Sequence, residues 1–423
     1  MPGLIIAAPT SGSGKTSITL GLLRAIRDKK IPVRAAKSGP DYIDPKFHEA
    51  ACGAPCFNLD AWAMTPDRIR DMAAGDELLL IEGAMGLFDG APPDGKGAVA
   101  DLARILKLPV VLVVDAARMA QSAAPLVQGF ANHDPDVRIA GVILNKLGSP
   151  RHARLLRTSL EQAGIKVFGA VMRDQDLSNP SRHLGLVQAH ERSDLEWFLD
   201  GAAAQVSEQV DIDALLQEAA PRPQSVATRP IPPSRRHVAV ARDAAFTFIY
   251  PHLLQEWIQS GVTLSIFSPL NDDPVPPADL IYLPGGYPEL HAARLSQAQT
   301  FKASLAKASK TTEIYGECGG YMVLGETLID GDGRAHEMTG LLPLDTSFAD
   351  RKLHLGYRNL NAHKGPFKGQ FKGHEFHYAT TLRAEGEPLF TARDAEGNSL
   401  PAMGLVKGHV SGSFAHIIDR VLL

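Results

Sequence analysis

The sequence predicts an α/β protein with two tandem domains, and three observations lead to this prediction. The chain has 423 residues, and domains commonly hold about 100–200 residues. Short apolar runs alternate with amphipathic stretches, which is typical of a parallel sheet covered by helices on both faces. A proline-rich stretch interrupts this alternation once. We therefore expect a first domain at residues 1–220, a linker at 221–236 and a second domain at 237–423.

The first domain alternates strands and helices. Thr16–Lys29 and Ala98–Leu106 have the periodicity of amphipathic helices. Short, mainly apolar runs lie before, between and after them and predict the buried strands of a parallel sheet. These runs are Leu4–Ala8, Val33–Ala36, Leu78–Ile81, Val110–Val114 and Ala140–Leu144.

The linker differs in composition from both domains. Residues 221–236 hold five prolines and four arginines but no aromatic residue, so they can bury little surface. The alternation then resumes, with Tyr250–Ser260 as a helix, while residues 331–400 have the short alternating runs of antiparallel hairpins. The strands expected before these hairpins are Val238–Ala241, Leu264–Phe267, Leu280–Leu283 and Glu313–Tyr315.

The composition excludes several classes of protein. Hydrophobic residues make up 44% and charged residues 21%, as in ordinary globular proteins. The formal net charge is −4, so no global basic field indicates nucleic acid as a partner. Apolar runs are far shorter than the roughly 20 residues of a membrane span. Three cysteines are too few for a disulfide framework, and they indicate a reducing, cytoplasmic location.

A phosphate-binding loop is predicted after the first strand. The segment AAPTSGSGKT at 7–16 leads from a strand into a helix, so backbone N–H groups of Gly12, Ser13 and Gly14 can face an anion. Lys15 would reach the outer phosphates, and the Thr16 hydroxyl would bind Mg²⁺. Proline occupies position 9, where the usual motif has its first glycine. The alternative is an ordinary turn rich in glycine and serine.

Four carboxylates follow two neighbouring strands. Asp41 and Asp44 lie in GPDYIDP at 39–45, and Glu82 and Asp89 lie in EGAMGLFDG at 82–90. In open parallel sheets, ligands bind beyond the carboxyl ends of the strands, where both loops begin. Mg²⁺ binds a few carboxylates together with phosphate oxygens. Each acid has the alternative of a helix cap or a turn residue.

A second site is predicted around Cys318. A strand leads into GECGG at 316–320 and then into an apolar run, which is the thiol version of a nucleophile elbow. The turn LPGG at 283–286 follows another strand, so N–H groups of Gly286 and Gly319 can form an oxyanion hole. The alternative for Cys318 is a buried structural cysteine, the role that we expect for Cys52 and Cys56.

A thiol nucleophile needs a base, which is usually histidine. His374, His377, His409 and His416 are the candidates in the second domain. Their spacing from the cysteine does not decide among them, because nucleophile and base are adjacent in space rather than in sequence.

With these motifs, the chain resembles the cobyrinic or hydrogenobyrinic acid a,c-diamide synthase family of corrinoid (vitamin B12) biosynthesis. The first half is similar to a dethiobiotin-synthetase-type ATP domain, and the second to a class I glutamine amidotransferase domain of the cobyrinic/cobyric acid synthase subgroup. The resemblance covers nearly the whole chain. It rests on APTSGSGKTS, KSGPDYIDPKFH, IEGAMGLFDG, SRHLGL, VAVARDAAFTFIYPHLLQ, LPGGYPEL, YGECGGYMVLGE and GHEFHYA.

The resemblance implies amidation of the a- and c-carboxylates of a corrin ring, with ATP as co-substrate, L-glutamine as nitrogen donor and Mg²⁺ as cofactor. It makes Cys318 the glutaminase nucleophile and His416 its base. Family members often carry a second histidine at position 418, where this chain has Ile, and no clear carboxylate follows His416, so we expect a Cys–His dyad. The resemblance places the loop residues on nucleotide phosphates and implies roles in metal binding or carboxylate activation for the acids. We expect Asp41 and Glu82 at Mg²⁺, Asp44 and Lys37 at the activated substrate, and Asp89 in catalysis.

The residues agree with this chemistry. A carboxylate is a poor electrophile, and transfer of a phosphoryl group would give an acyl phosphate that ammonia can displace. A corrin with many carboxylates needs positive contacts, and solvated surface charge is the alternative role for each basic candidate. These candidates are Arg34, Lys37, Lys46, Arg182 and His183.

Other functions stay open at this point. They are a cobyric acid synthase or an amidase of a nickel tetrapyrrole, a regulatory P-loop ATPase, and a non-catalytic corrinoid-binding protein. The regulatory ATPase leaves the cysteine elbow unexplained. The sequence does not decide whether the ring carries cobalt, and a homodimer stays open as the assembly. We expect neither nucleic acid nor a membrane as a partner.

Overall fold

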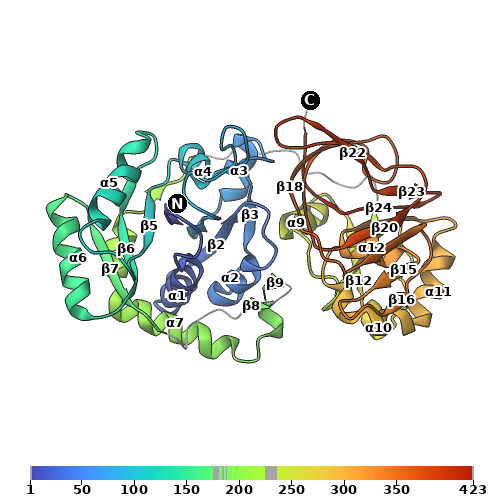
Figure 1. Cartoon of the computed structure of the whole chain (residues 1–423), viewed down its shortest axis with the longest axis horizontal. Helices are drawn as coiled ribbons and strands as arrows, with labels where there is room; N and C mark the ends of the chain where they lie inside the picture. Colours follow the sequence, from blue (N-terminus) through green and yellow to red (C-terminus); the bar gives the residue numbers. More distant parts are fainter. Residues whose placement is uncertain (1, 175–180, 183–184, 187, 224–235, 422–423) are drawn as a thin grey trace. The chain divides into compact units, whose positions relative to one another are not determined.

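The computed structural model describes residues 2–174, 181–182, 185–186, 188–223 and 236–421. The chain divides into two compact units, Met1–Thr228 and Arg229–Leu423 (Figure 1). The division between the units, after residue 228, falls within the predicted linker, of which residues 224–235 lie outside the described residues. The domain boundaries 220/221 and 236/237 therefore stay predictions.

The first unit is built on one sheet. Its strands follow the order β3-β2-β4-β1-β5-β6-β7, all parallel, and β10 adds an antiparallel pair to β1. The five strands expected from the sequence all form, so the predicted parallel sheet is confirmed. The strands are β1 Pro2–Ala7, β2 Val33–Ser38, β3 Phe57–Leu59, β4 Leu78–Glu82, β5 Val110–Asp115, β6 Ile139–Leu147, β7 Val167–Met172 and β10 Ala220–Pro221.

Helices cover this sheet, and α1 and α7 pack side by side (Figure 1). The buried core is made of apolar side chains from β1, β4 and β5 and from the inner faces of α1 and α7, such as Leu4, Leu22 and Phe198. The helices are α1 Lys15–Asp28, α2 Asp44–Cys52, α3 Pro66–Ala73, α4 Val99–Leu106, α5 Ala123–His133, α6 Pro150–Gln162, α7 Leu195–Gln209 and α8 Ile212–Gln217. A short hairpin, β8 Ser181–Arg182 with β9 Gly185–Leu186, was not expected from the sequence.

The second unit has a central sheet of order β12-β11-β13-β14-β24-β23, parallel except for β23. Its strands are β11 His237–Ala241, β12 Thr263–Phe267, β13 Leu280–Leu283, β14 Glu313–Glu317, β23 Leu405–Lys407 and β24 Val410–Ser413. The helices are α9 Pro251–Gln259, α10 Ala292–Gln297, α11 Gln299–Ala308 and α12 Gly319–Leu324. None of the described helices is both long and apolar enough to cross a membrane.

Two smaller sheets complete the second unit, with orders β16-β15-β17-β20 and β22-β21-β18-β19-β25. Within residues 331–400 every described strand pair is antiparallel, as expected. The strands are β15 Thr327–Ile329, β16 Ala335–Glu337, β17 Leu344–Ser347, β18 His354–Ala362, β19 Gly369–His377, β20 Thr380–Ala384, β21 Phe390–Arg393, β22 Ser399–Met403 and β25 Ala415–Arg420.

Strand register brings the predicted motifs together within each unit. In the first sheet Glu82 pairs with Ile6 on one side and with Lys37 on the other, so the loops after β1, β2 and β4 leave the same edge. In the second sheet Leu283 pairs with Gly316, and Glu317 pairs with Ser413. The glycine turn after β13 and the cysteine turn after β14 therefore begin side by side.

The close packing of α1 on α7 yields a test of the fold. A Cβ at Gly21 in α1 would lie 2.6 Å from the carbonyl oxygen of Ala202 in α7, so Gly21→Ala should force the helices apart and cost about 1–3 kcal/mol. The matched control is Gly129→Ala in α5, where a Cβ meets nothing within 4 Å. This control should gain about 0.5–1 kcal/mol because alanine favours helix.

Thermal unfolding followed by circular dichroism would measure both variants. The midpoint should fall for Gly21→Ala and stay or rise for Gly129→Ala. Equal midpoints for the two variants would contradict the packing of α1 on α7.

Candidate active sites in the two units

The loop after β1 has the backbone of a phosphate cradle. Gly12 and Gly14 adopt left-handed conformations, with φ of 79° and 85°. A Cβ at Gly14 would lie 2.2 Å from Nδ2 of Asn145, so only glycine fits there. The Asn145 amide donates to the carbonyl oxygen of Ser13 at 2.9 Å, and Lys146 Nζ donates to that of Gly12 at 2.5 Å. Side chains from β6 therefore hold the loop in shape.

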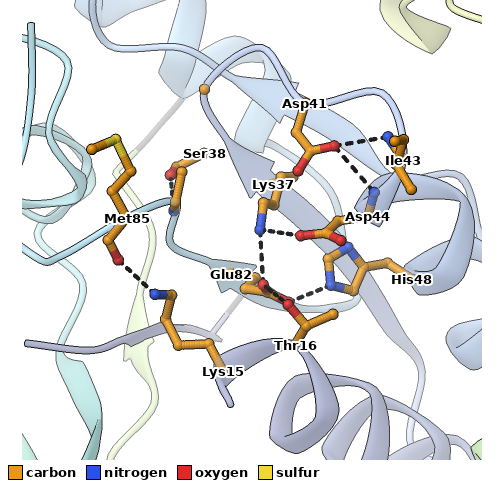
Figure 2. A network of polar contacts seen from close by, with 12 residues as sticks. Lys15, Thr16, Lys37, Ser38, Asp41, Ile43, Asp44, His48, Glu82 and Met85 are labelled. Atoms are coloured by element: carbon orange, nitrogen blue, oxygen red, sulfur yellow. Dashed lines mark hydrogen bonds and ion pairs between the residues drawn. The ribbon is translucent and has the colours of Figure 1, made fainter. Parts of the chain in front are cut away.

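Lys15 and Thr16 open α1 at this loop. Lys15 is buried, and its Nζ donates to the carbonyl oxygen of Met85 at 2.5 Å. Burial lowers the pKa of Lys15, although the charge of Glu82 opposes this shift. The Thr16 hydroxyl donates to Oε1 of Glu82 at 2.8 Å (Figure 2). The structure thus brings both residues to the acids after β4, as their positions in the sequence predicted.

Glu82 is the centre of a buried polar network (Figure 2). Lys37 Nζ donates to Glu82 Oε1 at 2.8 Å and to Asp44 Oδ2 at 2.6 Å, and His48 Nε2 lies 2.6 Å from Glu82 Oε2. Burial alone would raise the pKa of Glu82, but Lys37 and His48 outweigh it and hold this pKa far below its usual value. Burial would lower the pKa of Lys37, but the charges of Asp44 and Glu82 raise it. Glu82 and Lys37 therefore keep their charged forms.

His48 is a site residue that the sequence analysis missed, although it ends the motif KSGPDYIDPKFH. It follows Asp44 by four residues in α2, a spacing that puts both side chains on one helix face. That spacing was the available signal. His48 has no exposed surface, and its Nδ1 lies 3.8 Å from the Cys56 thiol.

Asp41 accepts backbone hydrogen bonds and also lines the cavity of the first unit. Its Oδ1 accepts hydrogen bonds from the N–H groups of Ile43 and Asp44, at 2.8 and 3.2 Å, so it caps the start of α2. Burial and the charge of Asp44 raise the pKa of Asp41 to about 6. Asp41, the Thr16 hydroxyl and Glu82 line the same cavity, and such oxygen ligands suit a divalent cation. These groups lie around a cavity of about 990 Å³.

Asp89 lies apart from this network. It is exposed, and its Oδ2 accepts a hydrogen bond from the N–H of Gly86 at 2.9 Å, which closes the turn after β4. Its charge nevertheless acts on Lys15. The geometry thus supports the turn role, and a catalytic role stays a prediction.

The basic candidates have different surroundings. Arg34 is buried and donates to the carbonyl oxygens of Met72 and Ala74 at 3.3 and 2.6 Å, so its expected role as a ligand contact is wrong and it supports the fold. Lys46 pairs with Glu49 within α2. Only the backbone of Arg182 is described, and His183 lies outside the described residues.

In the second unit, Cys318 forms a strained elbow between β14 and α12. It is buried and has a φ of 47°, which is rare for a residue with a side chain. Its N–H donates to the carbonyl oxygen of Ser413 at 2.8 Å. A Cβ at Gly320 would lie 1.9 Å from the carbonyl oxygen of Leu283, so the position two residues after Cys318 must be glycine. This is the geometry of a nucleophile elbow.

Gly286 and Gly319 lie close together beside the elbow. A Cβ at Gly319 would lie 2.9 Å from the nitrogen of Gly286, and a Cβ at Gly286 would lie 2.0 Å from the carbonyl oxygen of Ala245. Within the described parts of the chain, neither N–H donates a hydrogen bond to another residue. Two such N–H groups near a nucleophile can stabilise an oxyanion.

His416 faces Cys318 from β25. It is buried, and its ring packs on the turn after β13, where a Cβ at Gly285 would lie 2.5 Å from Cε1. Burial alone would lower the pKa of His416, but the negative charge of Cys318, a hydrogen bond to it and the carboxylate of Glu317 raise this pKa to about 10. The arrangement favours the imidazolium form of His416 beside the Cys318 sulfur.

The other three histidines have different partners. His409 is half-exposed and lies 3.9 Å from Glu313. His374 is near His416, and burial and the charge of His416 lower its pKa to about 3. His377 Nε2 lies 2.9 Å from Glu375 Oε1, and the ring stacks on Phe414. The geometry thus favours His416 as the base among the four candidates.

His377 also belongs to a cluster with His354 and Glu375, whose ligand atoms lie within 4.8 Å of one another. Arg358 already holds the other carboxylate oxygen of Glu375, at 2.7 Å. The cluster is therefore explained as a local ion-pair network at one end of the β18–β19 pair.

Glu317 lies close to the predicted Cys–His dyad, which stays a prediction. No clear carboxylate follows His416 in the sequence, whereas Glu317 directly precedes Cys318. Oε2 of Glu317 lies 3.5 Å from Nδ1 of His416, and both side chains are buried. The available signal was an acid inside the otherwise small and apolar motif YGECGG.

Comparisons with known proteins agree with this architecture. Residues 4–187 match the family described as CobQ/CobB/MinD/ParA nucleotide binding domain, and residues 237–420 match the CobB/CobQ-like glutamine amidotransferase domain. These two matches confirm the predicted pairing of a nucleotide-binding α/β domain with an amidotransferase domain.

Curated relatives match over almost the whole length. Proteins named hydrogenobyrinate a,c-diamide synthase are 55% identical in Brucella anthropi and 52% identical in Rhizobium meliloti, each over 99% of both chains. The protein of that name in Rhodobacter capsulatus is 50% identical over 98% of both chains. With this identity and coverage, the chain belongs to the a,c-diamide synthase family of amidating enzymes, as its motifs predicted.

Proposed function

We propose that this enzyme uses ATP and L-glutamine to amidate the a- and c-carboxylates of hydrogenobyrinic acid. The proposal is carried by one observation, the presence of two intact sites in a single chain: the phosphate loop with its acid network, and the cysteine elbow with His416. The curated relatives are named for the cobalt-free acid, which favours this substrate over cobyrinic acid. The proposed location is the cytoplasm, and a homodimer stays open.

The first unit would activate the carboxylate. N–H groups of the loop and Lys15 would bind the phosphates of ATP, and phosphoryl transfer to the substrate carboxylate would give an acyl phosphate and ADP. Thr16, Asp41 and Glu82 have the oxygen atoms to hold Mg²⁺, which would offset phosphate charge when bound. Lys37 would keep Glu82 in its charged form, and Asp44 would hold Lys37 in place.

The second unit would release ammonia from glutamine. The Cys318 thiolate would attack the side-chain amide, the N–H groups of Gly286 and Gly319 would stabilise the oxyanion, and His416 would give a proton to the leaving ammonia. Water would then hydrolyse the thioester to glutamate and restore the thiol. Ammonia would displace phosphate from the acyl phosphate and form the amide.

A comparison of two substrates tests the proposed specificity. The enzyme would be incubated with hydrogenobyrinic or cobyrinic acid together with glutamine, ATP and Mg²⁺. The masses of the products would be measured by mass spectrometry. We expect a diamide of the cobalt-free acid. One ADP and one glutamate should form for each amide. Formation of ADP without any amide would favour a regulatory ATPase instead.

Lys15→Ala should abolish amidation with either glutamine or added ammonia, because carboxylate activation precedes the use of either nitrogen source. Product mass and ADP release would measure the effect. Lys146→Ala is a useful comparison, since this side chain holds the loop backbone, and it should weaken ATP binding without removing turnover. Normal ammonia-dependent turnover by Lys15→Ala would contradict the assignment of the ATP site.

Cys318→Ala should lose glutamine-dependent amidation and keep amidation from added ammonia, because the elbow serves only the release of ammonia. Cys52→Ala is the control: this thiol donates to the backbone of Ala54 at 3.4 Å, far along the chain from the elbow. It should keep both activities. Glutamine use by Cys318→Ala would refute the nucleophile assignment.

A further inference from the structure

We propose that Glu317 is the positioning residue of the glutaminase site: it holds His416 so that its Nε2 faces Cys318, and it stabilises the imidazolium form. This inference rests on the proposed function of Cys318 and His416. Oε2 of Glu317 lies 3.5 Å from Nδ1 of His416. That distance is long for a hydrogen bond, but such catalytic contacts often tighten only when substrate binds.

The carboxylate of Glu317 is itself held in place. Its Oε2 accepts a hydrogen bond from the Tyr282 hydroxyl at 2.8 Å, and its Oε1 accepts one from the N–H of Ile417 at 3.2 Å. Burial and the charge of Glu317 raise the pKa of Tyr282 well above its usual value, so the hydroxyl stays protonated and keeps donating. These two donors come from β13 and β25, on either side of the site, and they fix the plane of the carboxylate.

The charge of Glu317 needs a cation. The residue is 3% exposed, and a buried carboxylate is costly unless a positive group or several hydrogen bonds compensate it. Among the ion pairs of the described residues, none joins Glu317 to a lysine or an arginine; its partner is His416. The protonated imidazole is therefore the cation that this pocket is built to receive.

The position of Glu317 follows from the elbow. β14 is parallel to β24 and ends at Glu317, and the chain then turns sharply at Cys318. On β25, Ile418 occupies the position two residues after His416 and is fully buried. The strand that carries His416 thus offers no acid at that position, whereas the residue before the nucleophile supplies one behind the imidazole.

Three glutamate variants would test this role. Glu317→Gln keeps the shape and removes the charge, and Glu317→Asp keeps the charge on a shorter side chain. Glu313→Gln is the matched control, because Glu313 begins the same strand and lies 3.9 Å from another histidine, His409, remote from the elbow. For each variant, glutaminase kcat and KM and ammonia-dependent amidation would be measured.

We expect Glu317→Gln to lower glutaminase kcat about a hundredfold or more, the usual effect of disabling a general base. KM for glutamine should stay within about threefold, since in the proposed role Glu317 acts through His416 and not on the substrate. Glu317→Asp should recover part of the lost kcat, and Glu313→Gln should match the parent. Ammonia-dependent amidation should persist in all three variants, because it needs only the site in the first unit.

The pH dependence of Cys318 alkylation by iodoacetamide gives a second readout, which a purely structural role would not change. The groups that face His416 are Cys318, Glu317 and His374. Removing the negative charge of Glu317 makes the imidazolium less stable, so the thiolate should form only at higher pH in Glu317→Gln. Glu313→Gln should leave the profile unchanged.

The outcomes separate this inference from the proposed function. Suppose that Glu317→Gln keeps the parental kcat and an unshifted alkylation profile, while Cys318→Ala lacks glutaminase activity. This result would overturn only the role of Glu317. Glutaminase activity in Cys318→Ala would overturn the proposed function. If Glu317→Gln does not fold, Tyr282→Phe removes one donor to Glu317 and should lower kcat and shift alkylation in the same directions; an unchanged Tyr282→Phe would then count against the proposal.

Discussion

Each unit places a buried glutamate at the carboxyl end of a strand inside its main sheet, and each candidate site is organised around that charge. Glu82 ends β4 and Glu317 ends β14, and both are almost fully buried. A carboxylate in such a place is stable only with close compensation. The need for compensation explains why so many polar side chains converge on these two positions.

The two glutamates are compensated in different ways, which suit different chemistry. Lys37 and His48 stabilise the charged form of Glu82, so the first site keeps a fixed negative charge near the phosphate loop. Glu317 receives neutral donors from Tyr282 and from the backbone of Ile417, and its remaining partner is a group that can gain and lose a proton. The first arrangement is suited to holding a cation and the second to proton transfer.

The sequence predicted the sheets and the loops well because both have local signals. Alternating apolar runs located the strands, and the glycines at positions 12, 14, 286 and 319 marked turns that only glycine allows. It did not predict the roles of His48, Glu317 and Arg34, since these depend on which side chains from distant strands become buried together. Arg34 was misjudged for this reason: its charge indicated a ligand, whereas burial turned it toward backbone carbonyl groups.

The position of Glu317 also explains why a search along β25 for a third member failed. β25 carries no acid two residues after His416, where Ile418 is buried at a register shift of the β19–β25 pair. The imidazole can equally be approached from the neighbouring strand, at the residue before the nucleophile. Because β14 carries both the thiol and this acid, a single strand end fixes the distance between nucleophile and acid, and His416 needs only to lie between them.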